Sequence, residues 1–156
     1  MKLVRKIGLF LGHLLTALIG TAILTTPIWR LRRPTSVSAA LRQEVIISIV
    51  CAALLGVTAA KLSKERLGLW VWVAVAPFFL FHVASVLSVE HHGSVLAEAH
   101  GVWAQIFGFE CVDESSVGYC RNFFAYTVPF VRVLAYSTGS VVGTRLFTAS
   151  PKGESD

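Results

Sequence analysis

Long apolar stretches almost devoid of ionisable side chains constrain the fold of this chain more than any other feature. They cover residues 7–29, 45–60, 67–89 and 123–144, and the charged or histidine residues within them are His13, His82 and Arg132. The hydrocarbon core of a bilayer takes about 20 apolar residues as a helix. Lipid leaves every backbone N–H and C=O group to be satisfied within its own segment, which favours helices. The sequence therefore predicts an all-α integral membrane protein.

The four stretches predict a single transmembrane domain over residues 1–148, followed by a short disordered tail at 149–156. We expect a compact bundle of four helices over residues 7–29, 42–60, 67–89 and 122–147. The second helix reaches a spanning length because the long polar side chains at residues 42–44 can extend to the interface. Basic residues precede the first stretch, as in a signal peptide. The stretch is longer than a typical signal core and lacks a small-x-small cleavage site, so we expect an uncleaved anchor.

The basic residues predict the orientation in the membrane. Charged residues make up 15% of the chain, against about 25% in an average soluble domain. The cations flank the apolar stretches, which is how membrane topology is encoded, so nucleic acid is not an expected partner. With both termini in the cytoplasm, eight of the fourteen lysines and arginines lie inside and five outside. We expect a multi-pass protein of the inner membrane in this orientation, although the run RLRR at residues 30–33 opposes it.

Two cysteines lie in the connection between the third and fourth spans. Cys111 and Cys120 occur in the polar segment FECVDESSVGYCRN, and a disulfide between them would close a short loop. Disulfides persist in oxidising compartments, so a paired loop lies outside, in agreement with the basic residues. The alternative is a pair of free thiols on a cytoplasmic loop. The third cysteine, Cys51, lies in an apolar run and is expected to be a small core residue.

Small residues recur every four positions in three of the four spans. Such a spacing places them on one ridge, and small ridges let helices approach closely in lipid. The ridges predict close packing, either within the bundle or against other membrane protein chains or further copies of this chain. The glycines expected to mediate packing are Gly8, Gly12, Gly20, Gly56, Gly139 and Gly143.

The stretch EHHGSVLAEAH at residues 90–100 is rich in histidine and glutamate. The apolar residues that follow Gly93 recur at helical spacing, which predicts a short amphipathic helix over residues 94–107 on the outer membrane surface. Glu98 and His100 lie about 200° apart on such a helix and cannot share a metal ion. A polar rim is therefore expected. The alternative is a divalent metal site built from His91, His92 and Glu98.

Arg132 lies near the middle of the fourth span, where a charge costs at least about 2.5–3.5 kcal/mol. Within the chain, Glu44 and Glu90 are the acidic residues that its long side chain can reach. A partner protein's acid, a lipid phosphate, helix-end carbonyls and extension to the interface without a partner are the alternatives. An ionisable residue at this depth is a functional hypothesis by default.

We expect a small accessory, assembly or structural subunit rather than an enzyme. The chain has no nucleophile elbow, CxxC, HExxH or glycine-rich phosphate loop. The alternative is a thiol–disulfide redox protein, or a metal- or haem-binding protein, that uses the outer loop. The layout of four spans with a cysteine pair in the second outer loop resembles the DsbB-type quinone-linked oxidases. Those proteins also carry a CxxC in the first outer loop, and residues 30–43 contain no cysteine. No cofactor is predicted; haem at His13 and His82 is disfavoured because the two lie at different depths.

Overall fold

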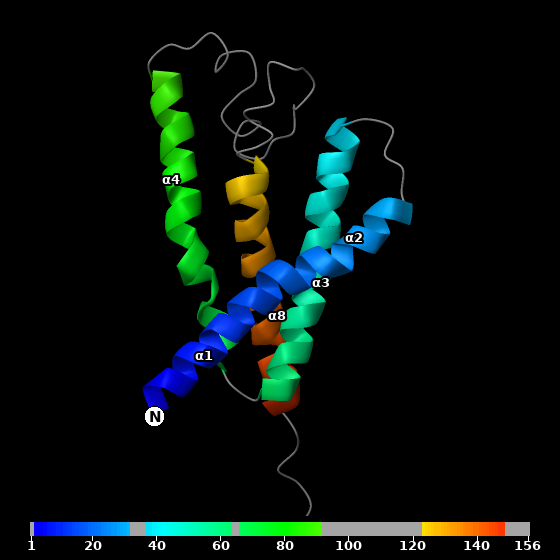
Figure 1. Ribbon diagram of the computed structural model, residues 1–156, viewed down its shortest axis with the longest axis vertical. Helices are drawn as coiled ribbons and strands as arrows, with labels where there is room; N and C mark the ends of the chain where they lie inside the picture. The colour runs from blue at the N-terminus through cyan, green and yellow to red at the C-terminus, as the bar shows by residue number, and fades with distance from the viewer. Residues whose placement is uncertain (1, 32–36, 64–65, 92–122, 149–156) are drawn as a thin grey trace, which may run out of the picture.

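The computed structural model describes residues 2–31, 37–63, 66–91 and 123–148 (Figure 1), and all of its elements there are helical. The prediction of an all-helical chain is therefore confirmed for this part of the protein. The predicted interfacial helix, the tail and the side chains of His91, His92 and Glu98 lie outside the described residues. The same holds for Cys111, Cys120 and the loop that they would close.

Four helical stretches follow one another along the chain. The first consists of α1 (Lys2–Leu15), a π-helical turn (Thr16–Gly20) and α2 (Thr21–Leu31). The second is α3 (Val37–Ser63). The third is a 3₁₀ turn (Arg66–Trp70) followed by α4 (Trp72–His91). The fourth is a π-helical turn (Phe123–Thr127) followed by α8 (Val128–Thr148).

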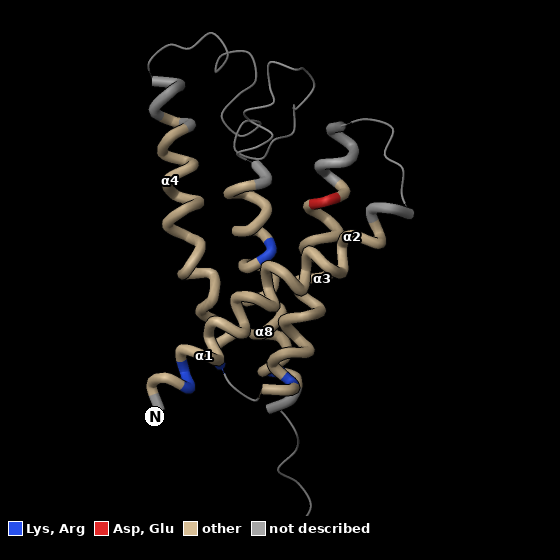
Figure 2. The backbone as a smooth tube through the Cα atoms, viewed as in Figure 1, with Lys and Arg blue, Asp and Glu red and all other residues tan. Residues whose placement is uncertain are grey.

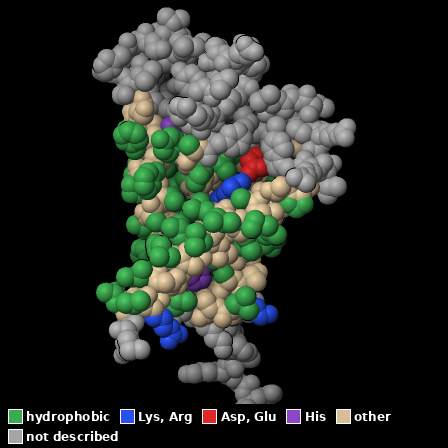
Figure 3. All heavy atoms as spheres, viewed as in Figure 1, with side chains coloured by type: hydrophobic (Ala, Val, Ile, Leu, Met, Phe, Trp, Pro, Cys, Tyr) green, Lys and Arg blue, Asp and Glu red, His purple; other side chains and the backbone are tan. Residues whose placement is uncertain are grey.

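Three of these helical stretches are long and apolar enough to cross a membrane: Leu3–Ile28, Gln43–Ser63 and Arg66–Ser85. Large aliphatic and aromatic side chains cover much of the described surface (Figure 3), as expected for helices that face lipid. The fourth stretch, which contains Arg132 and several serines and threonines, is not among the three. The structure thus supports a membrane protein with at least three spanning helices.

The bundle is built around α3 and α8, which lie side by side and run in the same direction (Figure 1). α4 runs in the opposite direction beside α8. The first helical stretch crosses the α3/α8 pair obliquely, with the N-terminus at the end of the bundle where α3 and α8 terminate. The main contacts of α1 outside its own stretch are with the 3₁₀ turn at Arg66–Trp70, so its N-terminal part diverges from α3.

Glycines make the close approach of α3 and α8 possible. A Cβ atom at Gly56 would collide with the carbonyl oxygen of Tyr136, and one at Gly139 would collide with that of Ala53. A Cβ atom at Gly143 would lie 2.9 Å from the carbonyl oxygen of Val57. Each position therefore accommodates hydrogen alone without moving a backbone.

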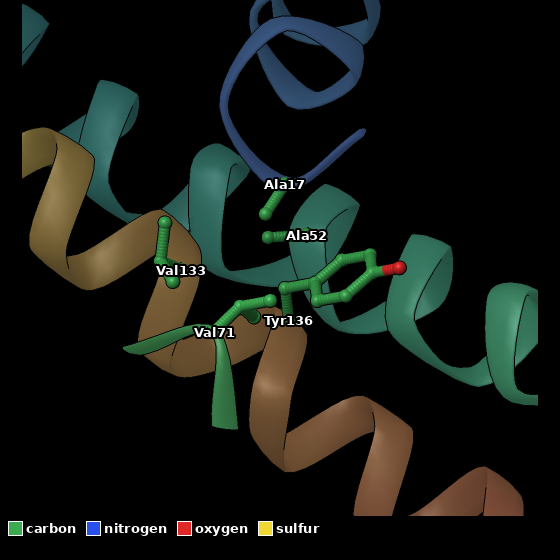
Figure 4. Packing of buried hydrophobic residues seen from close by; sticks show 5 residues of the cluster. All are labelled: Ala17, Ala52, Val71, Val133 and Tyr136. Carbon is green, nitrogen blue, oxygen red and sulfur yellow. The ribbon is translucent and has the colours of Figure 1, made fainter. Parts of the chain in front are cut away.

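The core lies where the first stretch crosses α3 and α8. Its fully buried side chains are Ala17, Ala52, Val71, Val133 and Tyr136 (Figure 4). Ala17 of the π-helical turn faces Ala52 of α3, and two methyl groups allow the helices to cross in contact. The small core fits a membrane protein, in which most large apolar side chains face lipid.

The buried face of the first stretch is offset by one residue from its glycine ridge. The ridge at Gly8, Gly12 and Gly20 neighbours a buried series whose members are four residues apart. That series comprises His13, Ala17, Thr21 and Thr25. His13 and Thr21, each of which directly follows a ridge glycine, are thus buried against the bundle.

Candidate functional site

An ion pair joins α3 and α8 inside the bundle. The Nη2 atom of Arg132 contacts the Oε1 atom of Glu44, and the Nε–H group of Arg132 donates to the Oγ atom of Ser48 at 3.1 Å. The Ser48 hydroxyl donates in turn to Oε1 of Glu44 at 3.0 Å. The three side chains therefore form a closed network, with the Arg132 and Glu44 side chains only 16% and 8% exposed.

The positions of these residues on their helices explain the network. Glu44 and Ser48 are one turn apart on α3 and so share a face. Figure 2 shows the basic segment of α8 closer to the middle of the bundle than the acidic segment of α3, and the long side chain of Arg132 spans this difference. Of the partners considered from the sequence, the structure brings Arg132 to Glu44. The side chain of Glu90 lies outside the described residues.

A second polar contact joins the first helix to α8. The Nδ1 atom of His13 lies 2.6 Å from the hydroxyl oxygen of Tyr136, and the two rings meet edge to face. Both side chains are buried. Gly68 lies beside this contact and packs closely on α8, because a Cβ atom there would lie 2.7 Å from Oγ of Ser140.

Two aromatic stacks fasten α4 to the fourth helical stretch. Phe79 stacks on Phe130 with ring centroids 4.1 Å apart, and His82 stacks on Tyr126 with centroids 5.3 Å apart. Tyr126 and the His13 partner Tyr136 are ten residues apart along one helical stretch, which corresponds to roughly 15 Å. His13 and His82 therefore contact different parts of the bundle. Within the described part of the chain, no three His, Cys, Asp or Glu side chains lie close enough to hold a metal ion.

An open groove separates α1 from α3. Its volume is about 450 Å³, and Tyr136 of α8 lines it together with residues from both helices. The wall from the first stretch consists of Gly8, Leu9, Gly12, His13 and Thr16, and the wall from α3 consists of Leu55, Thr58, Ala59, Leu62 and Ser63. The groove exists because α1 diverges from α3 and two of its residues lack side chains.

The six glycines singled out in the sequence fall into two sets. Gly56, Gly139 and Gly143 lie in the α3/α8 interface, where a side chain would collide with the opposite backbone or with Ala60. Gly8 and Gly12 line the groove, and a Cβ atom at either would meet nothing within 4 Å. Gly20 is intermediate, since its Cβ atom would contact Leu55 at 3.4 Å. Cys51 is a buried free thiol on α3.

Tyr136 and Ser48 are site residues that the sequence did not single out. A serine four residues after Glu44 is a signal for a shared helical face, but such spacings are common. Tyr136 carries no local signal at all, since its partner His13 lies 123 residues earlier in the chain.

Comparison with protein-family models, with curated proteins and with solved structures finds no match for the chain. The features that distinguish the described residues are the Arg132–Glu44–Ser48 network, the His13–Tyr136 contact and the groove beside Gly8 and Gly12. The first two fix helices to one another. The groove is a surface that the described residues leave open.

Proposed function

We propose that this chain is a four-span protein of the inner membrane with both termini in the cytoplasm. Three stretches are long and apolar enough to span, and α8 lies beside α3 along the bundle core. Five cations whose side chains the structure describes lie at the end of the bundle that holds the N-terminus and the ends of α3 and α8, which is called the basic end below. These are Arg5, Lys6, Lys61, Arg66 and Arg145. In the whole sequence, eight lysines and arginines belong to this end and five, among them Arg30 and Arg42, belong to the opposite end, so the bias favours a cytoplasmic basic end.

Within that membrane, we propose that the protein acts as an accessory subunit that packs against a transmembrane helix of another protein. The observation that carries this proposal is the open groove, with Gly8 and Gly12 uncovered along one wall. In lipid, helices associate through close van der Waals contact, which small residues permit. The equivalent small residues of α3 and α8 are already in contact with each other.

The size of the groove suits such a partner. A helical turn about 10 Å across and 5.4 Å high occupies roughly 420 Å³. The groove has a volume of about 450 Å³, which is of the same order, and it is open to the surface, so part of a crossing helix can approach it. Alanine, serine and threonine make up much of the α3 wall, so a partner's side chains can reach the floor formed by His13 and Tyr136.

The charged residues beside the groove favour a different protein as the partner over a second copy of this chain. Arg5 precedes Gly8 by three residues and Gly12 by seven, so all three lie on nearly one face of α1. A second copy packed in parallel on this face would place its own Arg5 and Lys6 against the first pair, and like charges repel. A partner with an acidic or neutral cytoplasmic end avoids this repulsion.

Native mass spectrometry of the protein extracted from its own membrane in a mild detergent tests the proposal. We expect the wild-type chain to carry a second, different membrane protein chain at fixed stoichiometry. Gly12→Leu should release that chain, because the new side chain occupies the groove, where a Cβ atom at this position meets nothing within 4 Å. Ala84→Leu is the matched control, since it adds the same side chain at an exposed site on α4.

Loss of the second chain from the Gly12→Leu variant, together with its retention by the Ala84→Leu variant, would support docking in the groove. A chain that stays bound to the Gly12→Leu variant would show that docking occurs elsewhere. A bound mass that matches a lipid or a second copy of this chain, rather than another protein, would also contradict the proposal.

A further inference from the structure

The fourth helical stretch combines two properties that conflict in a membrane helix. It is the most extensively packed stretch of the bundle, with contacts to α3, α4, the first stretch and the 3₁₀ turn. It nevertheless is not among the stretches that are apolar enough to span by composition, and Arg132 lies within it. An unpaired arginine at the centre of a helix lowers the insertion equilibrium by about 70- to 370-fold on translocon scales.

The Arg132–Glu44–Ser48 network compensates the cost of placing the Arg132 charge in lipid, and it can form only when α3 is present. Glu44 supplies the opposite charge, and Ser48 accepts from Nε of Arg132 while donating to Glu44. α3 precedes α8 in the chain, and its segment Gln43–Ser63 is apolar enough to span with Glu44 close to one end. The counter-ion is therefore already in the membrane when α8 is synthesised.

The small polar residues of α8 are a second reason why the insertion of this helix depends on the rest of the bundle. Ser137 and Ser140 are buried, and the Oγ atom of Ser140 donates to the carbonyl oxygen of Gly56 at 3.3 Å. On an isolated helix in lipid these hydroxyls and Arg132 would all face hydrocarbon. In the bundle the two serines are buried, and Ser140 and Arg132 bond to residues of α3.

We infer that α8 is not an autonomous membrane span but enters the bilayer as the partner of α3, with Glu44 as its required counter-ion. This inference rests on the four-span proposal. It also predicts an alternative topology, because a chain whose last stretch fails to insert has three spans and its C-terminus on the opposite side of the membrane.

The C-terminal topology is the readout. Two fusions of the full chain are compared, one with green fluorescent protein, which fluoresces when cytoplasmic, and one with alkaline phosphatase, which is active outside. The ratio of the two signals, normalised to the amount of fusion protein, reports the inserted fraction. For the wild-type chain we expect a cytoplasmic C-terminus.

Glu44→Gln should lower the ratio of cytoplasmic to outside signal at least tenfold, because it removes the counter-ion and leaves the shape of the side chain nearly unchanged. Arg132→Leu should keep the C-terminus cytoplasmic, and the double variant Glu44→Gln/Arg132→Leu should restore the ratio lost in Glu44→Gln. Gln43→Ala is the matched control at the neighbouring position, outside the network, and should leave the ratio within twofold of the wild type.

The outcomes separate this inference from the four-span proposal. A wild-type C-terminus on the outside would contradict the four-span arrangement itself. A cytoplasmic wild-type C-terminus that stays cytoplasmic in Glu44→Gln would overturn only the dependence of α8 on Glu44. A double variant that remains outside would also overturn it, because the charge of Arg132 would then not be the cause.

Discussion

His13 of the first helix and Tyr136 of α8 lie 123 residues apart in the chain and 2.6 Å apart in the bundle. Both side chains are buried, and the contact ties the crossing helix to the α3/α8 pair at the floor of the groove. The same tyrosine ring is part of the apolar core, while its hydroxyl points away from the other core side chains (Figure 4).

The first prediction concerns the hydroxyl of Tyr136. Tyr136→Phe keeps the ring and removes the contact with His13, so we expect the free energy of unfolding to fall by about 0.6–1.5 kcal/mol. Reversible unfolding in mixed detergent micelles measures this change. Tyr126→Phe is the control, since its stack with His82 does not need the hydroxyl. Equal losses in the two variants would contradict a specific role for the His13–Tyr136 contact.

The glycines of the α3/α8 interface and the glycines of the groove predict opposite responses to substitution. Gly139→Ala places a methyl group into the carbonyl oxygen of Ala53, so α3 and α8 must separate, at a cost of about 1–3 kcal/mol or more. Gly12→Ala adds the same group where nothing lies within 4 Å, and alanine is the better helix former, so stability should stay level or rise by up to about 1 kcal/mol. Equilibrium unfolding of both variants gives the comparison. A stable Gly139→Ala variant would show that the α3/α8 approach is looser than described.

The stack of Phe79 on Phe130 predicts that removal of one ring weakens the packing of α4 against α8. Phe130→Leu retains an apolar side chain but loses the ring, so we expect a destabilisation of about 0.5–1.5 kcal/mol beyond the lost area. Phe81→Leu is the control, because Phe81 is 68% exposed on the same α4 helix. Proteolysis rates of the folded protein report the loosening of α4. Similar proteolysis rates in the two variants would argue against a role of the stack in holding α4 against α8.

The cysteines test the orientation and the expected disulfide. In whole membranes, a membrane-impermeant thiol reagent should modify Cys111 and Cys120 only after reduction, and from the outer side. Cys51 is buried on α3 and should stay unmodified in the folded protein. Mass spectrometry of the alkylated chain distinguishes the sites. Modification without reduction, or only from the cytoplasmic side, would contradict the disulfide and the orientation, and would weaken the redox alternative as well.

The apolar stretches alone predict helices that are long and apolar enough to cross a membrane. This follows from a local requirement, because lipid satisfies no backbone hydrogen bonds and each segment must do so by itself. The expected orientation also follows from a local feature, namely the basic residues at the helix ends. The interior charge of Arg132 was likewise visible in the sequence as a residue that requires an explanation.

Which residues meet across the bundle depended on the tertiary structure. Glu44 and Glu90 were equally plausible partners for Arg132 from their positions in the chain, and the packing of α3 beside α8 brings Glu44 to it. The ridges of small residues in the first, second and fourth helical stretches have the same spacing, yet those of α3 and α8 pack together while Gly8 and Gly12 border a groove. The spacing of residues along a helix is a property of one segment. Which face of that helix meets another helix depends on the crossing angle between the two segments. The oblique crossing of the first helix therefore decided which face was buried and which was left open.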